Sequence, residues 1–348
     1  MRLWVKNADF TREGLIENFE SLIWTKRYWE CGDFELYLPA SETALNLLKQ
    51  DRYLVREDDD AVMIIERLEI TTDSEDGNHL IVSGRSLESI LTRRIVWEQT
   101  TYKDTPELVI YGLLRDAMIA PAAAQRKIDS MGFVYEESGN TAVSMQFTGT
   151  DIYDAVTDIC KDYGFGFKLT ENLVFTLYIG KDRSQGQSKN ARVIFSPAYG
   201  NLLESDYFSD KEEYKTIVRI AGEGEGSSRV YATYGTSASG INRRELFVDA
   251  RDLQKEDSEG NVMTAAEYHN ALIARAKEQY AQHRIDTAFS GTIDTNGAFV
   301  YRKDYDLGDI VTVQNEYGMT ENCRIVEVIE NWDSTGYKAI PKYERVNA

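Results

Sequence analysis

The residues with catalytic or metal-binding chemistry are scattered along this chain of 348 residues. His269 and His283 fall at the two ends of one predicted helix and His79 in an acidic turn, so no H-E-x-x-H or similar metal spacing occurs. No G-x-S-x-G motif is present, and no cysteine has a histidine near it in sequence to act as a base. We therefore predict no catalytic residue, no metal site and no cofactor. An acid pair of the glycosidase kind stays an alternative, because the sequence singles out no pair among its 58 acidic residues.

The stretch GRSLESILTRR (84–94) raises the question of a phosphate site. Gly84 follows an apolar run, and Ser86 is placed to cap a short helix whose positive N-terminal end can bind an anion. Arg93 and Arg94 fall in the last turn, where they complement the negative end of the helix dipole. The stretch is thus either a phosphate site or a strand-to-helix corner. A second candidate, AGEGEGSS (221–228), lacks the Lys-Ser/Thr ending of a P-loop and indicates a hairpin tip.

Two acidic turns and one aromatic cluster are the remaining candidate sites. The run Asp58-Asp59-Asp60 and the turn DSEDGNH (73–79) do not match a calcium loop with its terminal glutamate, so we interpret both as solvated turns. The cluster Trp24, Tyr28 and Trp29 is typical of a carbohydrate platform or of a β-barrel wall and its edge. The sequence leaves these two interpretations open.

Composition indicates a folded, acidic protein. Acidic residues outnumber basic ones by 58 to 39, the formal net charge is −19, and no run of four Lys/Arg occurs, which disfavours a protein that grips nucleic acid. The three cysteines are far apart and predict buried thiols rather than disulfides. We find neither an apolar signal core nor a run long enough to span a membrane, so we expect a soluble chain without a membrane anchor.

The periodicity predicts β-rich ends and helices between them. Strands are expected near both termini, including one long strand over 61–70, with a short helix after Ser41. Thr105 and Pro106 start a predicted helix that runs to residue 119, and Asp151 starts another that ends at Gly164. A long helix is predicted over 264–283.

Five stretches carry a family resemblance in combination: KRYWECGDFELYLPAS (26–41), REDDDAVMIIERLEI (56–70), VSGRSLESILTRRIV (82–96), GTDIYDAVTDICKDYGFGFKL (149–169) and DYDLGDIVTVQNEYGMTENCRIVEVIENW (304–332). Together they resemble siphovirus tail-tip hub proteins, which are related to the N-terminal module of tail-associated (Tal) proteins and to myophage baseplate hubs. The likeness spans most of the chain, and each motif is structural rather than catalytic.

The resemblance implies an α+β, β-rich fold with two β-barrel tube domains and an inserted helical subdomain. The expected domains are a first barrel (1–97), an α/β insert (98–185) and a second barrel (186–348) that includes the long helix. Three chains would form a homotrimer that imitates a six-fold ring and continues the tail tube. The residues that we expect at subunit contacts are Arg85, Arg93, Arg94, Trp24, Tyr28 and Trp29.

The implied partners belong to a phage, prophage or tail-like particle. The ring would stack on the hexameric distal tail protein and meet the tape-measure protein and other tail-tip or receptor-binding proteins. DNA would cross the lumen only as a transient passenger, and an acidic wall would reduce its sticking. The protein would be made in the host bacterial cytoplasm and end at the virion tail tip.

No enzymatic activity is expected from the resemblance. Many Tal proteins carry a long C-terminal extension with a cell-wall peptidase or lysin, whereas this chain stops at Ala348, just after its last predicted strand. Two alternatives remain: a receptor- or carbohydrate-binding tail module that uses the aromatic cluster, and a cell-wall hydrolase that uses an acid pair.

Overall fold

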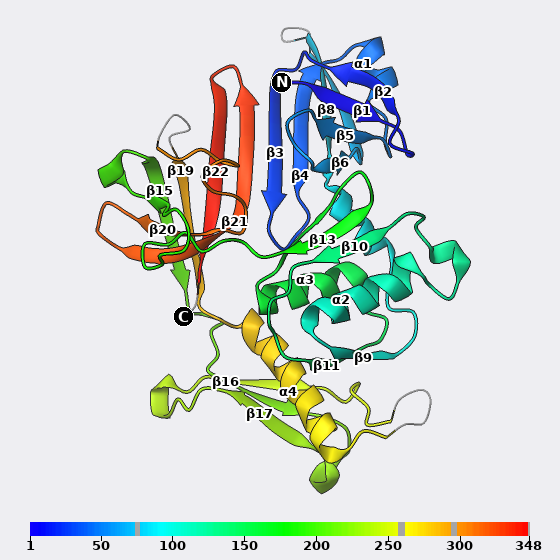
Figure 1. The fold of residues 1–348 in the computed structure, drawn as a ribbon, viewed down its shortest axis with the longest axis vertical. Coiled ribbons are helices and arrows are strands. Elements are labelled where there is room, and N and C mark those ends of the chain that lie inside the picture. Colours follow the sequence, from blue (N-terminus) through cyan, green and yellow to red (C-terminus); the bar gives the residue numbers. More distant parts are fainter. Residues whose placement is uncertain (74–76, 257–261, 294–297, 347–348) are drawn as a thin grey trace.

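The structure is a computed structural model that describes residues 1–73, 77–256, 262–293 and 298–346. It is an α+β, β-rich fold in which one long sheet runs through the molecule, with α1 near the top and α2, α3 and α4 in the lower half of the view of Figure 1. The predicted turn at 73–79 lies partly outside the described residues.

The first part of the chain forms two sheets around one apolar core. Its elements are β1 (Leu3–Lys6), β2 (Arg12–Ile16), β3 (Ser21–Arg27), β4 (Asp33–Pro39), α1 (Glu42–Leu47), β5 (Tyr53–Arg56), β6 (Val62–Ile64), β7 (Arg67–Asp73) and β8 (Gly77–Arg85). One sheet has the order β2-β1-β5-β6, and β3, β4, β8 and β7 belong to the long sheet. Alternate residues of β3 and β4, such as Leu22, Trp24 and Phe34, point into the shared core. As predicted, the Ser41 hydroxyl caps α1 by accepting from the Ala44 N–H.

The single strand predicted over 61–70 is wrong, because the chain changes sheets in the middle of that stretch. The Ile65 N–H donates to Arg52, beside the first sheet, whereas the next N–H, of Glu66, donates to Ser83 of β8. A Cβ atom on Gly84 would lie 1.9 Å from the carbonyl oxygen of Ile64, so the close crossing requires glycine there. The corner produces two strands, β6 and β7, where the hydrophobic pattern shows only one.

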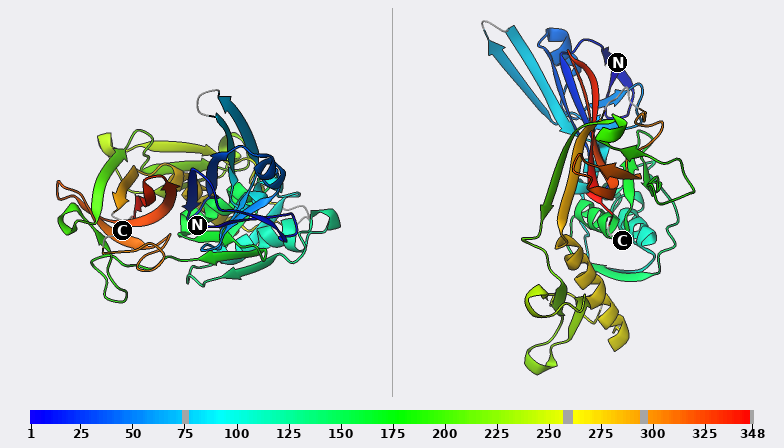
Figure 2. Two further views of the ribbon diagram at one scale, coloured as in Figure 1. Left: turned by 90° about the horizontal axis from the view of Figure 1, so that it is seen from above. Right: turned by 90° about the vertical axis from the view of Figure 1, so that its left-hand side faces the viewer.

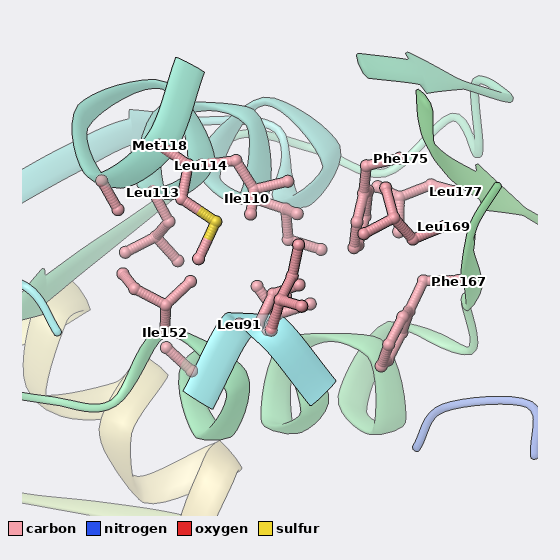
Figure 3. Packing of buried hydrophobic residues seen from close by; sticks show 14 of the residues in the cluster. Leu91, Ile110, Leu113, Leu114, Met118, Ile152, Phe167, Leu169, Phe175 and Leu177 are labelled. Carbon is pink, nitrogen blue, oxygen red and sulfur yellow. The ribbon is translucent and has the colours of Figure 1, made fainter. Parts of the chain in front are cut away.

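The insert consists of β9 (Thr100–Asp104), α2 (Pro106–Leu114), β10 (Gly132–Tyr135), β11 (Val143–Phe147), α3 (Ile152–Tyr163), β12 (Gly166–Leu169) and β13 (Val174–Tyr178). Both predicted helices are confirmed, and α2 continues into a π-helical turn over Arg115–Ile119. Asp151 caps α3, and Gly164 ends it in the left-handed conformation with φ of 76°. Figure 3 shows Ile110 and Met118 of α2 and its π turn, Ile152 of α3 and Phe175 of β13 meeting in one core. Val62 and Ile64 of β6 join the same core, so the insert packs directly on the first part.

The last part of the chain supplies β14 (Ile194–Phe195), β15 (Leu202–Asp210), β19 (Asp286–Ile293), β20 (Ile310–Gln314), β21 (Thr320–Asp333) and β22 (Gly336–Arg345). These strands continue the sheet of the first part, because β21 pairs antiparallel with β3 from Glu327↔Arg27 to Trp332↔Leu22. The resulting strand path is β15-β19-β22-β21-β3-β4-β8-β7, and off this path β20 pairs with β21 and β14 pairs with β20. The two β-rich ends of the sequence thus share one sheet, and β1, β2, β5 and β6 form a separate one.

Residues 215–283, called here the α4 module, form a separate small layer. It holds β16 (Ile217–Ala221), β17 (Tyr231–Gly235), β18 (Glu245–Asp249) and α4 (Ala265–Gln282), which has its own apolar core. The predicted long helix is confirmed, and Thr264 and Glu267 form a capping box at its start. Figure 2 shows this module at one end of the molecule and the β7–β8 hairpin at the other.

The β-rich α+β class is confirmed, but closed barrels are not found among the described strands. The long sheet ends at β7 and β15, and the four-stranded sheet ends at β2 and β6. One strand of the first part, β3, pairs with β21 of the last part. The domain boundaries at 97/98 and 185/186 stay a prediction.

Tyr28, in the turn after β3, packs where the first part, the insert and the last part meet. Its side chain is fully buried, and its hydroxyl donates to the Gly164 carbonyl (2.9 Å) and accepts from the Gly180 N–H (3.2 Å). A Cβ atom on Gly166 of β12, or on Gly308 in the last part, would lie 2.2 Å from the Tyr28 ring. Glycine at both positions lets the three segments close around this ring.

We therefore predict that Gly166→Ala lowers the free energy of unfolding by about 2 kcal/mol, because the new methyl group overpacks the site. Gly186→Ala is the matched control, since a Cβ atom there meets nothing within 4 Å. Urea unfolding of both variants measures the difference. An unchanged unfolding midpoint for Gly166→Ala would contradict this account of the junction.

Candidate functional site

A cluster of buried charges joins the first and last parts of the chain beneath the long sheet. Arg56, at the end of β5, has a fully buried side chain whose guanidinium donates to Glu330 of β21 (2.8 Å) and to Asp58 (2.7 Å). The guanidinium carbon also lies 4.3 Å from the ring centroid of Trp332. Hydrogen bonds and an aromatic face therefore replace the water that this cation loses on burial.

Asp59 occupies the centre of the same cluster. Its fully buried carboxylate lies 2.8 Å from Arg302, 3.1 Å from Lys26 of β3 and 3.7 Å from Arg56. Burial opposes ionisation, but the three cations outweigh it and hold the pKa of Asp59 well below its ordinary value. The interpretation of Asp58-Asp59-Asp60 as a solvated turn is wrong for Asp59, because Arg56, three residues earlier, and Lys26 and Arg302 from two distant segments converge on its carboxylate.

Sequence reasoning missed Arg56, Arg302 and Glu330. One signal was present in β21. Glu330 lies two residues from both Val328 and Trp332, so all three side chains point to the same, core-facing side of the strand. A charged residue at such a position needs a buried partner. The partner comes from a strand 274 positions away, which local pattern cannot identify.

The expected contact residues Trp24 and Tyr28 are fully buried within the chain, which corrects both the interface prediction and the carbohydrate-platform alternative for them. Trp24 packs in the core of the first part, and Tyr28 fills the three-segment junction. Trp29 is half-buried and packs against the Tyr28 ring at a centroid distance of 5.5 Å. None of the three rings forms a flat, open surface that a sugar could stack on.

The stretch 84–94 is a structural corner. It forms a short 3₁₀ helix (Leu87–Arg93) with Ser86 at the predicted N-cap position, but the Ser86 hydroxyl accepts from the Gly32 N–H (2.7 Å) and makes no capping hydrogen bond to the helix. Glu88 is buried and accepts from the Leu169 N–H of β12 (2.8 Å), and burial raises the pKa of this carboxyl. A buried acid at the helix start, tied to another segment, leaves no place for a phosphate.

The three arginines of that stretch differ in their surroundings. Arg85 makes a two-pronged pair with Glu66 (2.8 and 2.9 Å), which fixes the corner between β6 and β7. Arg94 donates to the Arg126 and Arg93 carbonyls, whereas the Arg93 side chain is exposed. Their role in subunit contacts stays a prediction.

A cleft of about 580 Å³ lies where the first part, the insert and the last part meet. Its charged lining is largely paired: Lys168 with Asp60 (2.6 Å), and Arg183 with Asp309 (2.6 Å). Among the described residues, no group of three or more His, Cys, Asp or Glu side chains is placed to hold a metal ion. Within the same residues, no helix combines the length and apolar character needed to cross a membrane.

The two ends of the long sheet are exposed and partly apolar. On the described strand path, β7 pairs with β8 at one end and β15 with β19 at the other, so each end strand has one unpaired edge. Ile70 of β7 is 53% exposed, and Leu203 and Phe208 of β15 are 63% and 49% exposed. Unpaired backbone groups beside exposed apolar side chains are suited to pairing with a further strand.

A family model described as Siphovirus ReqiPepy6 Gp37-like protein matches residues 1–342. The chain belongs to this family. No curated protein sequence matches it. The resemblance inferred from the five sequence stretches is thereby confirmed.

Solved structures show that the fold is that of phage and prophage tail proteins. The tail protein from Neisseria meningitidis MC58 is 15% identical with a TM-score of 0.65, over 98% of this chain and 95% of that chain. The 43 kDa tail protein of prophage MuSo2 from Shewanella oneidensis is 13% identical with a TM-score of 0.64, over 99% and 98%. Prophage tail protein gp18 from Listeria monocytogenes EGD-e is 11% identical with a TM-score of 0.60, over 100% and 96%.

We predict that Asp59→Asn lowers the free energy of unfolding by about 3 kcal/mol at pH 7, because the remaining buried cations lose their shared partner. Asp60→Asn is the control, since the adjacent Lys168–Asp60 pair is exposed and contributes less than about 1 kcal/mol. Folding lowers the pKa of Asp59. The difference in the free energy of unfolding between wild type and Asp59→Asn is therefore largest above about pH 4 and becomes smaller as the pH falls below that value. Urea unfolding at pH 7 and pH 3 measures both effects, and equal losses for the two variants at pH 7 would contradict the assignment.

Proposed function

We propose that this protein is a structural hub of a phage, prophage or tail-like particle, in which three copies form a ring that continues the tail tube. The observation that carries the proposal is the long sheet with two different open edges, β7 and β15. A contact between unlike edges is heterologous, so repeating it produces a closed ring or an open filament. A ring in which β7 of each copy pairs with β15 of the next leaves neither end of the long sheet unpaired.

The apolar side chains at the two edges support this arrangement. Ile70 on β7, and Leu203 and Phe208 on β15, are exposed in the single chain and would be covered in the ring. Closing the sheet between copies also satisfies backbone groups that otherwise face solvent. The number of copies rests on the family resemblance rather than on the edges themselves.

The comparisons support a tail role. The proteins from Neisseria, Shewanella and Listeria carry the descriptions tail protein or prophage tail protein, and each aligns with this chain over nearly the full length of both. By extension, the partners are a hexameric distal tail protein, the tape-measure protein and other tail-tip or receptor-binding proteins. The proposed location is the virion tail tip, and the proposed role is structural rather than enzymatic.

The acidic lumen wall stays a prediction, and the exposed face of the sheet does not favour it. On the face turned away from the cores, Glu327 pairs with Lys342 (2.7 Å) and with Arg27 (2.6 Å), and Arg27 also pairs with Asp33 (2.5 Å). These charges neutralise one another across four adjacent strands. A wall built from this face would present balanced charge to passing DNA at that level.

We expect the wild-type protein to have a mass of three 39.7 kDa chains by size-exclusion chromatography with light scattering. Ile70→Lys and Phe208→Lys should each shift it toward the monomer, because a buried unpaired ammonium disfavours edge pairing. Ile241→Lys is the control, since Ile241 is fully exposed and belongs to the α4 module rather than to either edge. A wild-type monomer at every concentration, or equal shifts in all three variants, would contradict the proposal.

A further inference from the structure

Helix α4 makes the main contact of the α4 module with the insert. α4 packs its inner face on β16 and β17 of its own module and its other side on β11 and α3 of the insert. In Figure 1, α4 lies between the insert above it and its own small sheet. A movement of the module relative to the insert would therefore change the contacts of α4 with α3 and β11.

Carboxyl groups gather at this contact. Asp158 and Asp162 lie one turn apart on α3, Glu278 belongs to α4, and Asp252 follows β18. All four line a cavity of about 250 Å³ between the insert and the module. The segment of β11 that lines the same cavity, Ser144–Phe147, has no charged side chain.

Cations at the contact are fewer and are partly engaged elsewhere. Arg275 of α4 lies between Asp252 (3.3 Å) and Glu278 (3.4 Å), and Lys161 of α3 pairs with Glu30 (2.6 Å). Lys277 lies 4.2 Å from the ring centroid of Tyr163. Farther along α4, Lys103 of β9 pairs with Glu267 (3.7 Å). Within the described ranges, Asp158 and Asp162 form no ion pair.

The surroundings make ionisation of these acids unfavourable. Burial, then the charges of Glu278 and Asp158, raise the pKa of Asp162 to about 7, and Lys277 and Arg284 offset this only in part. Burial also raises the pKa of Asp158; the charge of Asp154 adds to the rise, and the charge of Lys161 partly offsets it. Burial likewise raises the pKa of Glu278, and the charge of Arg275 partly offsets that rise. Each group binds its proton more tightly in the docked arrangement than in water.

We propose that the contact of α3 with α4 is a pH-sensitive joint, which holds the α4 module against the insert when Asp158, Asp162 and Glu278 are protonated and loosens when they ionise. Repulsion between the ionised carboxylates on the two sides of this half-buried interface drives the opening. The cavity already present between the two surfaces gives water a route to the ionised groups.

The direction follows from linkage. Because the docked state binds more protons than the undocked state, docking is strongest below the ordinary carboxyl pKa and weakens as the pH rises toward 7. Above that value Asp162 is ionised in both states, and its proton no longer contributes to docking.

A pair of spin labels across the joint tests the proposal. The label sites are Asp129→Cys in the insert and Ile241→Cys in the module, which are both exposed, in a chain whose half-buried Cys31 is replaced by serine. Pulsed electron paramagnetic resonance should show one narrow distance distribution at pH 5.5. A second, displaced population should appear with a midpoint near pH 7 and dominate at pH 8.5. Far-UV circular dichroism over the same range checks that the chain stays folded.

Two variants locate the origin of the change. Asp162→Asn combined with Glu278→Gln should keep the narrow distribution at both pH values, because the repelling charges are gone. Glu57→Gln, which removes an exposed carboxylate far from the joint, should keep the pH-dependent change of the wild type. A wild-type distribution that does not change with pH, or a change that survives in the double variant, would overturn the proposal.

Discussion

The pairing of β3 with β21 is the constraint on which the rest of the structure depends. It joins strands about 300 positions apart, and with it the first and last parts of the chain become one sheet. The cluster of Arg56, Asp59 and Glu330 lies directly under this pair. Burying such charges is unfavourable unless every one is paired, so the cluster tolerates one arrangement of the two parts and few others.

The open edges of the sheet are a consequence of that pairing. With β3 and β21 paired, the strand path of the long sheet ends at β7 and β15, and these two strands do not pair with each other. Exposed, partly apolar edges are a liability for a protein that works alone and an asset for one that assembles with copies of itself. The proposed ring would cover both of these edges.

Elements with local signals could be predicted from the sequence, and those that depend on distant partners could not. The helices after Ser41, Asp151 and Thr264 begin where their capping residues stand, because a cap needs only its own first turn. The corner between β6 and β7 was missed because it depends on the close crossing of Gly84. Asp59 was taken for a solvated residue because two of its three cations, Lys26 and Arg302, come from segments that are distant in sequence. The family resemblance supplied what local pattern lacked, although the two closed barrels that it implied are one open sheet in the single chain.

The most direct test of ring formation through the sheet edges is single-particle cryo-electron microscopy of the purified oligomer. The account predicts three copies around one axis, with β7 of each copy hydrogen-bonded to β15 of the next in one continuous sheet. A trimer in which both edges face solvent, or an oligomer held together through the α4 module alone, would contradict it.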